Sequence, residues 1–217
     1  MTVRRSIHIH TDAAQLPGDL IVPGDAGGVV VFAHGSGSSR RSPRNVAVAE
    51  RLEVAGLATL LFDLLTPAEA ADRALVFDIE LLASRLGAAI VAVRDAADVP
   101  AVPLGLFGAS TGAAAALVAS TFDDANVGAI VSRGGRPDLA GNALQRVTAP
   151  VLLIVGSDDP DVLGLNRAAA ERIRAETRVE VVPGATHLFE EPGAMEIVAD
   201  LATSWFVRNL GERVRSA

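Results

Sequence analysis

Short apolar runs alternate with longer amphipathic segments along most of this chain. Runs typical of strands buried on both faces lie at 28–33, 57–62, 127–131 and 151–155. Segments with helical spacing of apolar residues lie between or after them, at about 43–55, 78–97, 161–175 and 192–210. Because strands alternate with helices, the pattern predicts an α/β fold: a mostly parallel central sheet with helices on both faces.

The two ends of the predicted sheet have different patterns. Residues 4–11 alternate, with Ile7 and Ile9 on one side, which predicts a half-buried strand. A second strand is predicted at 16–22, and this opening pair of strands can be antiparallel. At the other end of the chain, the pattern predicts the last strand at 178–182. Residues 64–77 show no regular pattern and are too short for a helical lid, so we expect no substantial lid and a fairly open site.

One stretch in the middle of the chain carries a recognisable chemical motif. The apolar run 104–107 leads into Gly108-Ala-Ser-Thr-Gly112, and an alanine-rich segment follows at once. This strand–turn–helix with G-x-S-x-G is the pattern of a nucleophile elbow, which exposes the hydroxyl of Ser110 on a sharp turn. Glycines two residues away on each side leave room for the helix to fold back over the strand. The pattern also occurs by chance in Gly- and Ala-rich loops, so its interpretation depends on the rest of the chain.

Several polar residues follow the carboxyl ends of the predicted strands, where ligands of parallel sheets gather. These residues are His34, Ser110, Arg133, Asp158, Asp159 and His187. A serine hydroxyl needs a general base, and the base needs an orienting carboxylate. Ser110, Asp159 and His187 occur in the chain order that follows a nucleophile elbow, which predicts a Ser-His-Asp triad.

Four motifs together resemble the α/β-hydrolases of the dienelactone-hydrolase-like group over nearly the full length. They are His34-Gly-Ser-Gly-Ser-Ser, Gly108-Ala-Ser-Thr-Gly, Gly156-Ser-Asp-Asp-Pro-Asp-Val and Gly184-Ala-Thr-His-Leu-Phe. The family spacing Gly-x-x-Asp-x-x-Val implies Asp159 as the triad acid; Asp158, one residue away, is the alternative. Dienelactone hydrolases proper use cysteine as the nucleophile, whereas this chain has Ser110, so dienelactone itself is not the expected substrate. Similar hydrolase domains also occur joined to phosphoribosyltransferase-like domains, and we expect none within these residues.

The tetrahedral intermediate of acyl transfer needs hydrogen-bond donors for its oxyanion. We expect one from the backbone N–H of Thr111, at the start of the helix after the elbow, and the other from Ser36 in the glycine loop. His34 precedes the nucleophile in the chain, so we expect it to hold this loop by hydrogen bonds rather than to act as the base.

Two groups of arginines follow strand ends. Arg40, Arg41 and Arg44 come after the glycine loop, and Arg133 and Arg136 come after the strand 127–131. Salt bridges on a solvated face would explain them. The alternative is recognition of an anionic substrate group by Arg133, Arg40 or Arg41, and Arg133 is the better candidate because it lies nearer its strand.

Composition narrows the remaining possibilities. The formal net charge is −7, which disfavours nucleic acid or an anionic membrane as a partner. There is no cysteine, which excludes disulfides, a thiolate nucleophile and Cys-based metal sites. The first ten residues hold no apolar signal-peptide core, so we expect a cytoplasmic protein. We expect no metal and no organic cofactor, and the oligomeric state stays open.

The 217 residues are expected to form a single α/β-hydrolase domain, 1–217. The predicted function is a serine hydrolase that cleaves an ester, lactone or thioester of a small substrate, with an anionic group as one option, through an acyl-enzyme. The same triad could transfer the acyl group to another acceptor. A non-catalytic binding or scaffold domain on the same fold is the alternative from another class, and the intact triad argues against it.

Overall fold

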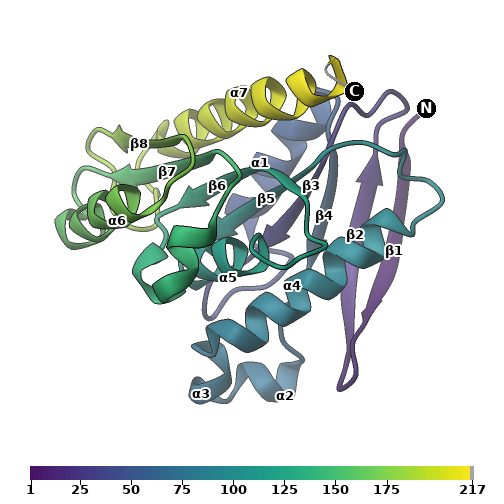
Figure 1. The fold of residues 1–217 in the computed structure, drawn as a ribbon, viewed down its shortest axis with the longest axis horizontal. Coiled ribbons are helices and arrows are strands. Elements are labelled where there is room, and N and C mark those ends of the chain that lie inside the picture. Colours follow the sequence, from purple (N-terminus) through teal and green to yellow (C-terminus); the bar gives the residue numbers. More distant parts are fainter. Residues whose placement is uncertain (216–217) are drawn as a thin grey trace.

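A computed structural model describes residues 1–215, with the side chains of residues 1–211. Eight strands form one sheet in the order β1-β2-β4-β3-β5-β6-β7-β8 (Figure 1). The strands are β1 Val3–His10, β2 Gln15–Val22, β3 Val29–Ala33, β4 Ala58–Phe62, β5 Leu104–Ala109, β6 Val127–Arg133, β7 Val151–Gly156 and β8 Thr177–Val182. Strand β2 pairs antiparallel with both β1 and β4, and the pairs from β4 to β8 are parallel. The predicted mostly parallel sheet with an antiparallel opening pair is confirmed.

Helices cover both faces of the sheet (Figure 1). They are α1 Pro43–Val54, α2 Pro67–Ala70, α3 Arg73–Val76, α4 Ile79–Arg94, α5 Thr111–Ala119, α6 Pro160–Arg172 and α7 Ala194–Arg215, with a 3₁₀ segment at Pro137–Arg146. Helices α1 and α7 pack on one face around Phe32, Phe107 and Phe206. Helices α4 and α5 pack on the other, where the alanines of α5 are buried almost completely. Their small side chains let α5 lie close to β3 and β6, the strands on either side of β5.

The buried central strands explain the apolar runs in the sequence. Every residue of β3, β4, β5, β6 and β7 is buried. Burial of an apolar side chain contributes about 1.5–3 kcal/mol, so these runs account for much of the folding free energy. The strand predicted at 127–131 is too short, however. Strand β6 continues through Ser132 and Arg133, which pair with Gly108 and Ala109 of β5.

Residues 64–77 differ from the expectation of an irregular segment, because they contain the single-turn helices α2 and α3. Thr66 caps α2: its hydroxyl accepts from the backbone N–H of Glu69, and the Glu69 carboxylate accepts from the backbone N–H of Thr66. Pro67 occupies the first turn, where its missing N–H costs nothing. The capping box followed by proline is a local helix signal that the hydrophobic pattern alone does not show.

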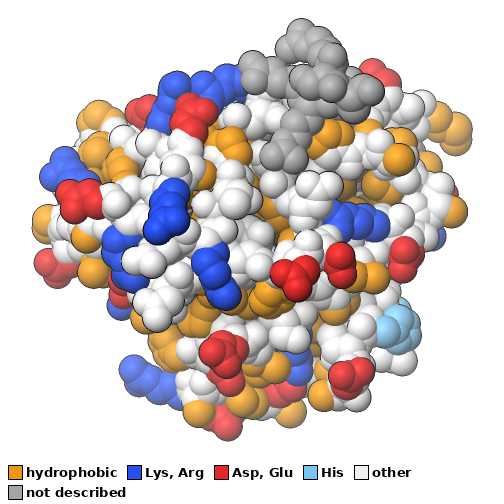
Figure 2. Space-filling model, in the orientation of Figure 1, with side chains coloured by type: hydrophobic (Ala, Val, Ile, Leu, Met, Phe, Trp, Pro, Cys, Tyr) orange, Lys and Arg blue, Asp and Glu red, His pale blue; other side chains and the backbone are white. Residues whose placement is uncertain are grey.

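No helix in the described part of the chain is both long and apolar enough to cross a membrane. On the face shown in Figure 2, basic and acidic side chains are interspersed.

Candidate active site

Ser110 lies on the tight turn between β5 and α5 in a strained backbone conformation, with φ 51° and ψ −120°. Neighbouring strands enforce this conformation. The Ser110 N–H donates to the Arg133 carbonyl oxygen at 3.2 Å, and the Ser110 carbonyl oxygen accepts from Ala113 and Arg136 at 3.1 Å each. Strain of about 1–3 kcal/mol persists only where the surroundings fix it, and here it lifts the side chain out of the sheet.

The two glycines of the elbow are required by close approach of the backbone. A Cβ on Gly108 would lie 2.4 Å from the Ala113 Cα, and one on Gly112 would lie 2.2 Å from the Ala33 carbonyl oxygen. Both contacts are with rigid backbone, so neither position can accept a larger residue without movement of α5 or β3. The glycines of the G-x-S-x-G pattern are therefore required by the helix folding back over the strand, as expected from the sequence.

His187 and Asp159 meet at the edge of the sheet next to this turn. The Nδ1 atom of His187 lies 2.7 Å from Oδ2 of Asp159, and the Asp159 side chain is mostly buried. The approach of the two loops depends on Gly156, since a Cβ there would lie 2.0 Å from the Ala185 carbonyl oxygen. Asp158 is exposed and accepts a hydrogen bond from Ser157 instead. Between the two candidate carboxylates, only Asp159 contacts His187.

The imidazole of His187 packs on the turn that follows β6. A Cβ on Gly134 would lie 3.7 Å from Cε1 of His187. Gly134 follows Arg133, whose carbonyl oxygen accepts from the Ser110 N–H. The elbow and His187 therefore both contact the short segment Arg133–Gly134. Among residues 1–211, no side chain is hydrogen-bonded to the Ser110 hydroxyl. Such bonds are often long in a free enzyme and shorten when substrate binds.

The glycine loop after β3 lies against the elbow and lines a pocket. A Cβ on Gly35 would lie 2.9 Å from the Ser110 Cβ, which places this loop next to the hydroxyl. Ser36 is exposed on the loop, and Thr111 begins α5, where the first N–H groups of a helix lack intrahelical acceptors. Both residues line the same pocket of about 340 Å³. The structure thus brings together the two residues expected to supply oxyanion donors.

His34 holds the glycine loop by two hydrogen bonds. Its Nε2 accepts from the backbone N–H of Leu64 at 3.0 Å, so its Nδ1 carries the hydrogen and donates to the Gly35 carbonyl oxygen at 3.0 Å. Burial lowers the pKa of His34, against the opposing effects of the Gly35 bond and Asp63. The neutral ring is therefore the stable form, which confirms the expectation that His34 supports the loop.

The arginines after the glycine loop are engaged by carboxylates or face solvent. Arg40 binds Asp63 at 2.5 Å and Asp19 at 3.0 Å. Arg41 is exposed, and its guanidinium makes no ion pair within residues 1–211. Arg44 pairs with the exposed Glu190 at 3.1 Å. Salt bridging thus explains Arg40, whose guanidinium is already occupied, better than substrate recognition does.

Arg133 is the exception among these arginines. Only 7% of it is exposed, and its guanidinium makes no hydrogen bond or ion pair with any of the described side chains. Its Cζ lies 5.9 Å from the ring centroid of Phe189. Burial, and secondly the charge of Arg44, lower the pKa of Arg133 to about 10. Arg133 therefore stays cationic at neutral pH without a counter-charge, whereas Arg136 binds Asp138.

Known proteins resemble this chain over most of its length. The model of the dienelactone hydrolase family matches residues 18–205. A crystal structure of dienelactone hydrolase from Anabaena variabilis superposes with a TM-score of 0.92 at 50% identity, covering 96% of this chain and 99% of that one. Est1E from Butyrivibrio proteoclasticus superposes with a TM-score of 0.79 at 16% identity, covering 95% of this chain and 99% of Est1E, which shows the shared fold.

Curated relatives are longer than this chain. Two proteins from strains of Mycobacterium tuberculosis, provisionally named phosphoribosyl transferases, are 60% identical to it over 193 residues. The match takes in 89% of this chain but only 44% of each relative. More than half of each named protein therefore has no counterpart in the aligned region.

Proposed function

Because this chain belongs to the dienelactone hydrolase family of α/β-hydrolases, we propose that it is a serine hydrolase with Ser110, His187 and Asp159 as its triad. Its substrate is a small ester, lactone or thioester, cleaved through an acyl-enzyme. The observation that carries the proposal is the 2.7 Å bond between His187 and Asp159 beside a serine on a strained strand-to-helix turn. A serine hydroxyl, a base and a carboxylate that orients the base are the requirements of nucleophilic catalysis.

The first half of the reaction forms the acyl-enzyme. Asp159 accepts the Nδ1 hydrogen of His187, which leaves Nε2 free to remove the proton of the Ser110 hydroxyl. The Ser110 oxygen attacks the carbonyl carbon, and the carbonyl π electrons move to oxygen. As the tetrahedral intermediate collapses, the bond to the leaving group breaks and His187 gives the proton to that group.

Two backbone N–H groups, of Thr111 and Ser36, stabilise the oxyanion in this mechanism. One such donor is worth about 10²–10³ in kcat. His34 acts through this loop, since its ring bonds the backbone of Gly35 and of Leu64, both of which line the pocket. Glycine at position 35 lets the loop approach Ser110.

The second half releases the acid. Water donates a proton to His187, attacks the acyl carbon and displaces Ser110, which recovers its proton. An acceptor other than water at this step would make the protein an acyltransferase with the same residues. The name of the Mycobacterium tuberculosis relatives describes proteins of more than twice the matched length, and we infer that the matched part contributes the hydrolase chemistry.

We also infer that the substrate carries an anionic group that binds Arg133. A buried guanidinium without a carboxylate partner is costly, and an anionic ligand would offset that cost through charge-assisted hydrogen bonds. Arg133 ends the strand next to β5, and its own carbonyl oxygen accepts from Ser110, so the backbone that carries this arginine lies against the elbow.

A fluorophosphonate probe tests the nucleophile directly. The native protein should be labelled once, on the peptide that contains Ser110, and Ser110→Ala should prevent labelling. A set of p-nitrophenyl esters, with and without an alcohol acceptor, then measures turnover and separates hydrolysis from transfer. Labelling that persists in Ser110→Ala, or native protein that neither labels nor turns over, contradicts the proposal and favours a non-catalytic domain.

A further inference from the structure

The pocket beside the expected oxyanion donors has a largely apolar second wall. Besides the glycine loop and Thr111, the lining includes Leu64 and Leu65 after β4 and Leu82 of α4. Three further residues come from the segment that forms α2 and α3, namely Pro67, Ala70 and Val76. The volume of about 340 Å³ is at the lower end of the range for small-molecule sites, which is about 300–1,000 Å³.

The α2–α3 segment (67–76) has little of its own to hold it in place. Each of its two helices has four residues, and neither contains a buried residue. A single helical turn is not stable alone, because fixing the first turn costs more conformational entropy than one hydrogen bond returns. The position of this wall must therefore depend on contacts with the rest of the protein.

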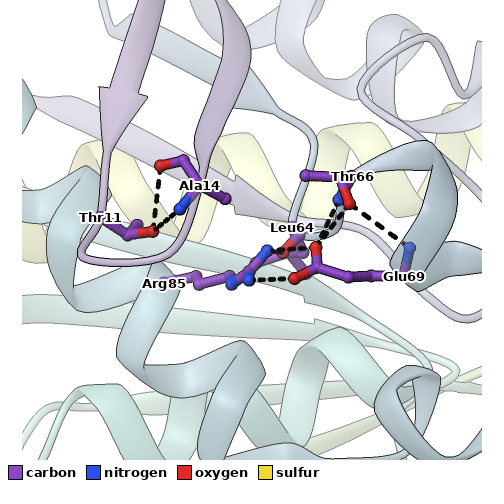
Figure 3. Close-up of polar contacts among 6 residues, drawn as sticks. All are labelled: Thr11, Ala14, Leu64, Thr66, Glu69 and Arg85. Carbon is purple, nitrogen blue, oxygen red and sulfur yellow. Dashed lines mark hydrogen bonds and ion pairs between the residues drawn. The ribbon is translucent and has the colours of Figure 1, made fainter.

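Val76 of α3 packs against the hydrophobic core, and the polar contact that holds α2 is an ion pair between Glu69 of α2 and Arg85 of α4 (Figure 3). The two guanidinium Nη atoms of Arg85 donate to the two carboxylate oxygens of Glu69 at 2.6 and 2.8 Å. Arg85 also donates to the Leu64 carbonyl oxygen at 3.1 Å. Figure 3 shows that Glu69 in turn accepts from the backbone and the hydroxyl of Thr66, both at 2.8 Å. The buried guanidinium of Arg85 on α4 thus contacts both the segment that follows β4, at Leu64, and α2, at Glu69.

The ion pair has the geometry of a rigid connection. Arg85 is only 3% exposed, and the Glu69 side chain is 22% exposed. Two parallel bonds between a guanidinium and a carboxylate fix orientation as well as distance. Removing one partner would leave a buried charge, so the pair resists opening.

We propose that this pocket binds the acyl group of the substrate, and that Arg85 and Glu69 are positioning residues that limit its length by fixing the α2–α3 wall. The inference rests on the proposed function and adds its acyl specificity: a short, compact aliphatic acyl group. The carbonyl oxygen, held near Ser36 and Thr111, places the attached carbon at the mouth of the pocket. Ala70 and Val76 then meet the end of the chain.

Helix α2 offers a matched pair of substitutions. Ala70 lines the pocket, whereas Ala68 is also exposed on the same turn and does not line it. Ala70→Leu should lower kcat/KM for p-nitrophenyl hexanoate about tenfold relative to the acetate, which is the usual effect of a misfitting methylene or two. Ala68→Leu should leave the ratio unchanged. Equal losses on all esters, or equal effects of the two variants, would overturn the pocket assignment.

The ion pair is tested by relaxing the wall without filling the pocket. Glu69→Gln and Arg85→Met should raise kcat/KM for the hexanoate relative to the acetate by about tenfold, mainly through KM, while kcat for the acetate stays near the native value. Arg85→Lys should restore part of the native ratio, because it keeps one charge contact. A uniform loss of kcat in these variants would mean that the pair only supports the fold.

Two controls separate the acyl assignment from the proposed function. Esters with a constant acetyl group and alcohols of increasing size should respond equally in native protein and Ala70→Leu. A change confined to the alcohol series would reject the acyl assignment. Fluorophosphonate labelling of Ser110 must persist in every variant, so a flat acyl profile in labelled, active protein rejects this inference alone.

Discussion

The Asp159 carboxylate lies 2.7 Å from Nδ1 of His187, whereas the carboxylate of Asp158, its neighbour in the chain, accepts a hydrogen bond from Ser157. Asp159→Asn should therefore lower kcat by about 10³–10⁴, because an amide cannot hold the imidazole in the tautomer that leaves Nε2 free. Asp158→Asn is the matched control, with an expected loss below tenfold. Steady-state kinetics on one ester measures both, and the reverse order of losses would contradict the assignment of Asp159.

Arg133 should discriminate between charged and neutral substrates. A charge-assisted contact of a buried arginine is worth about 1.5–3 kcal/mol, which corresponds to about ten- to a hundredfold in kcat/KM. Arg133→Ala should cause that loss for a carboxylate-bearing or phosphate-bearing ester and leave its neutral analogue nearly unchanged. Comparing the carboxylate and phosphate esters identifies the preferred anion.

Arg41→Ala is the control for Arg133, because Arg41 is exposed and follows the glycine loop. It should leave the ratio between charged and neutral esters as it is in the native protein. Equal losses on both esters in Arg133→Ala would show that Arg133 supports the fold, and a native preference for the neutral ester would exclude the anion proposal.

The ion pair between Glu69 and Arg85 makes stability depend on pH in a defined window. The hydrogen bonds from Arg85, with smaller contributions from Thr66, lower the pKa of Glu69 from 4.5 to about 2 despite partial burial. A carboxyl with a depressed folded pKa stabilises the protein above its unfolded pKa, and this contribution disappears as pH falls from about 4.5 to about 2. Urea unfolding of native protein and Glu69→Gln should differ most near neutral pH and converge only near pH 2; a difference independent of pH would contradict this.

Gly112 and Gly164 form a matched pair for the packing at the elbow. A Cβ on Gly112 would lie 2.2 Å from a backbone oxygen, while one on Gly164 in α6 meets nothing within 4 Å. Gly112→Ala should lower the free energy of unfolding by about 1–3 kcal/mol or more through overpacking. Gly164→Ala should raise it by about 0.5–1 kcal/mol through helix propensity. Urea titration measures both, and a tolerated Gly112→Ala would mean that α5 can move away from β3.

The sheet and the elbow could be predicted from the sequence because their signals are local. A strand buried on both faces needs an apolar run, and the backbone crowding around Ser110 needs glycine at 108 and 112. The parallel strands β5, β7 and β8 end at one edge of the sheet, and Ser110, Asp159 and His187 follow those ends. In such cases each residue type is dictated by its immediate neighbours.

The pocket wall and the environment of Arg133 depend instead on contacts between distant segments. Glu69 and Arg85 lie on different helices, and nothing near either residue in the chain shows that they pair. Strand β6 continues through the polar residues Ser132 and Arg133, although the apolar run stops at Val131. Pairing with β5 and β7 supplies the backbone hydrogen bonds of these two residues. Arg133 was therefore expected beyond the strand, and its burial could not be read from the pattern.

The backbone of Ser110 also has a consequence for how this protein would adapt. Positive φ values such as its 51° are unfavourable for residues with a Cβ and readily adopted by glycine. The substitution that would relax the turn, Ser110→Gly, removes the proposed nucleophile at the same time. Selection for thermal stability alone would thus favour an inactive variant at this position. A screen for more stable variants must therefore also measure turnover.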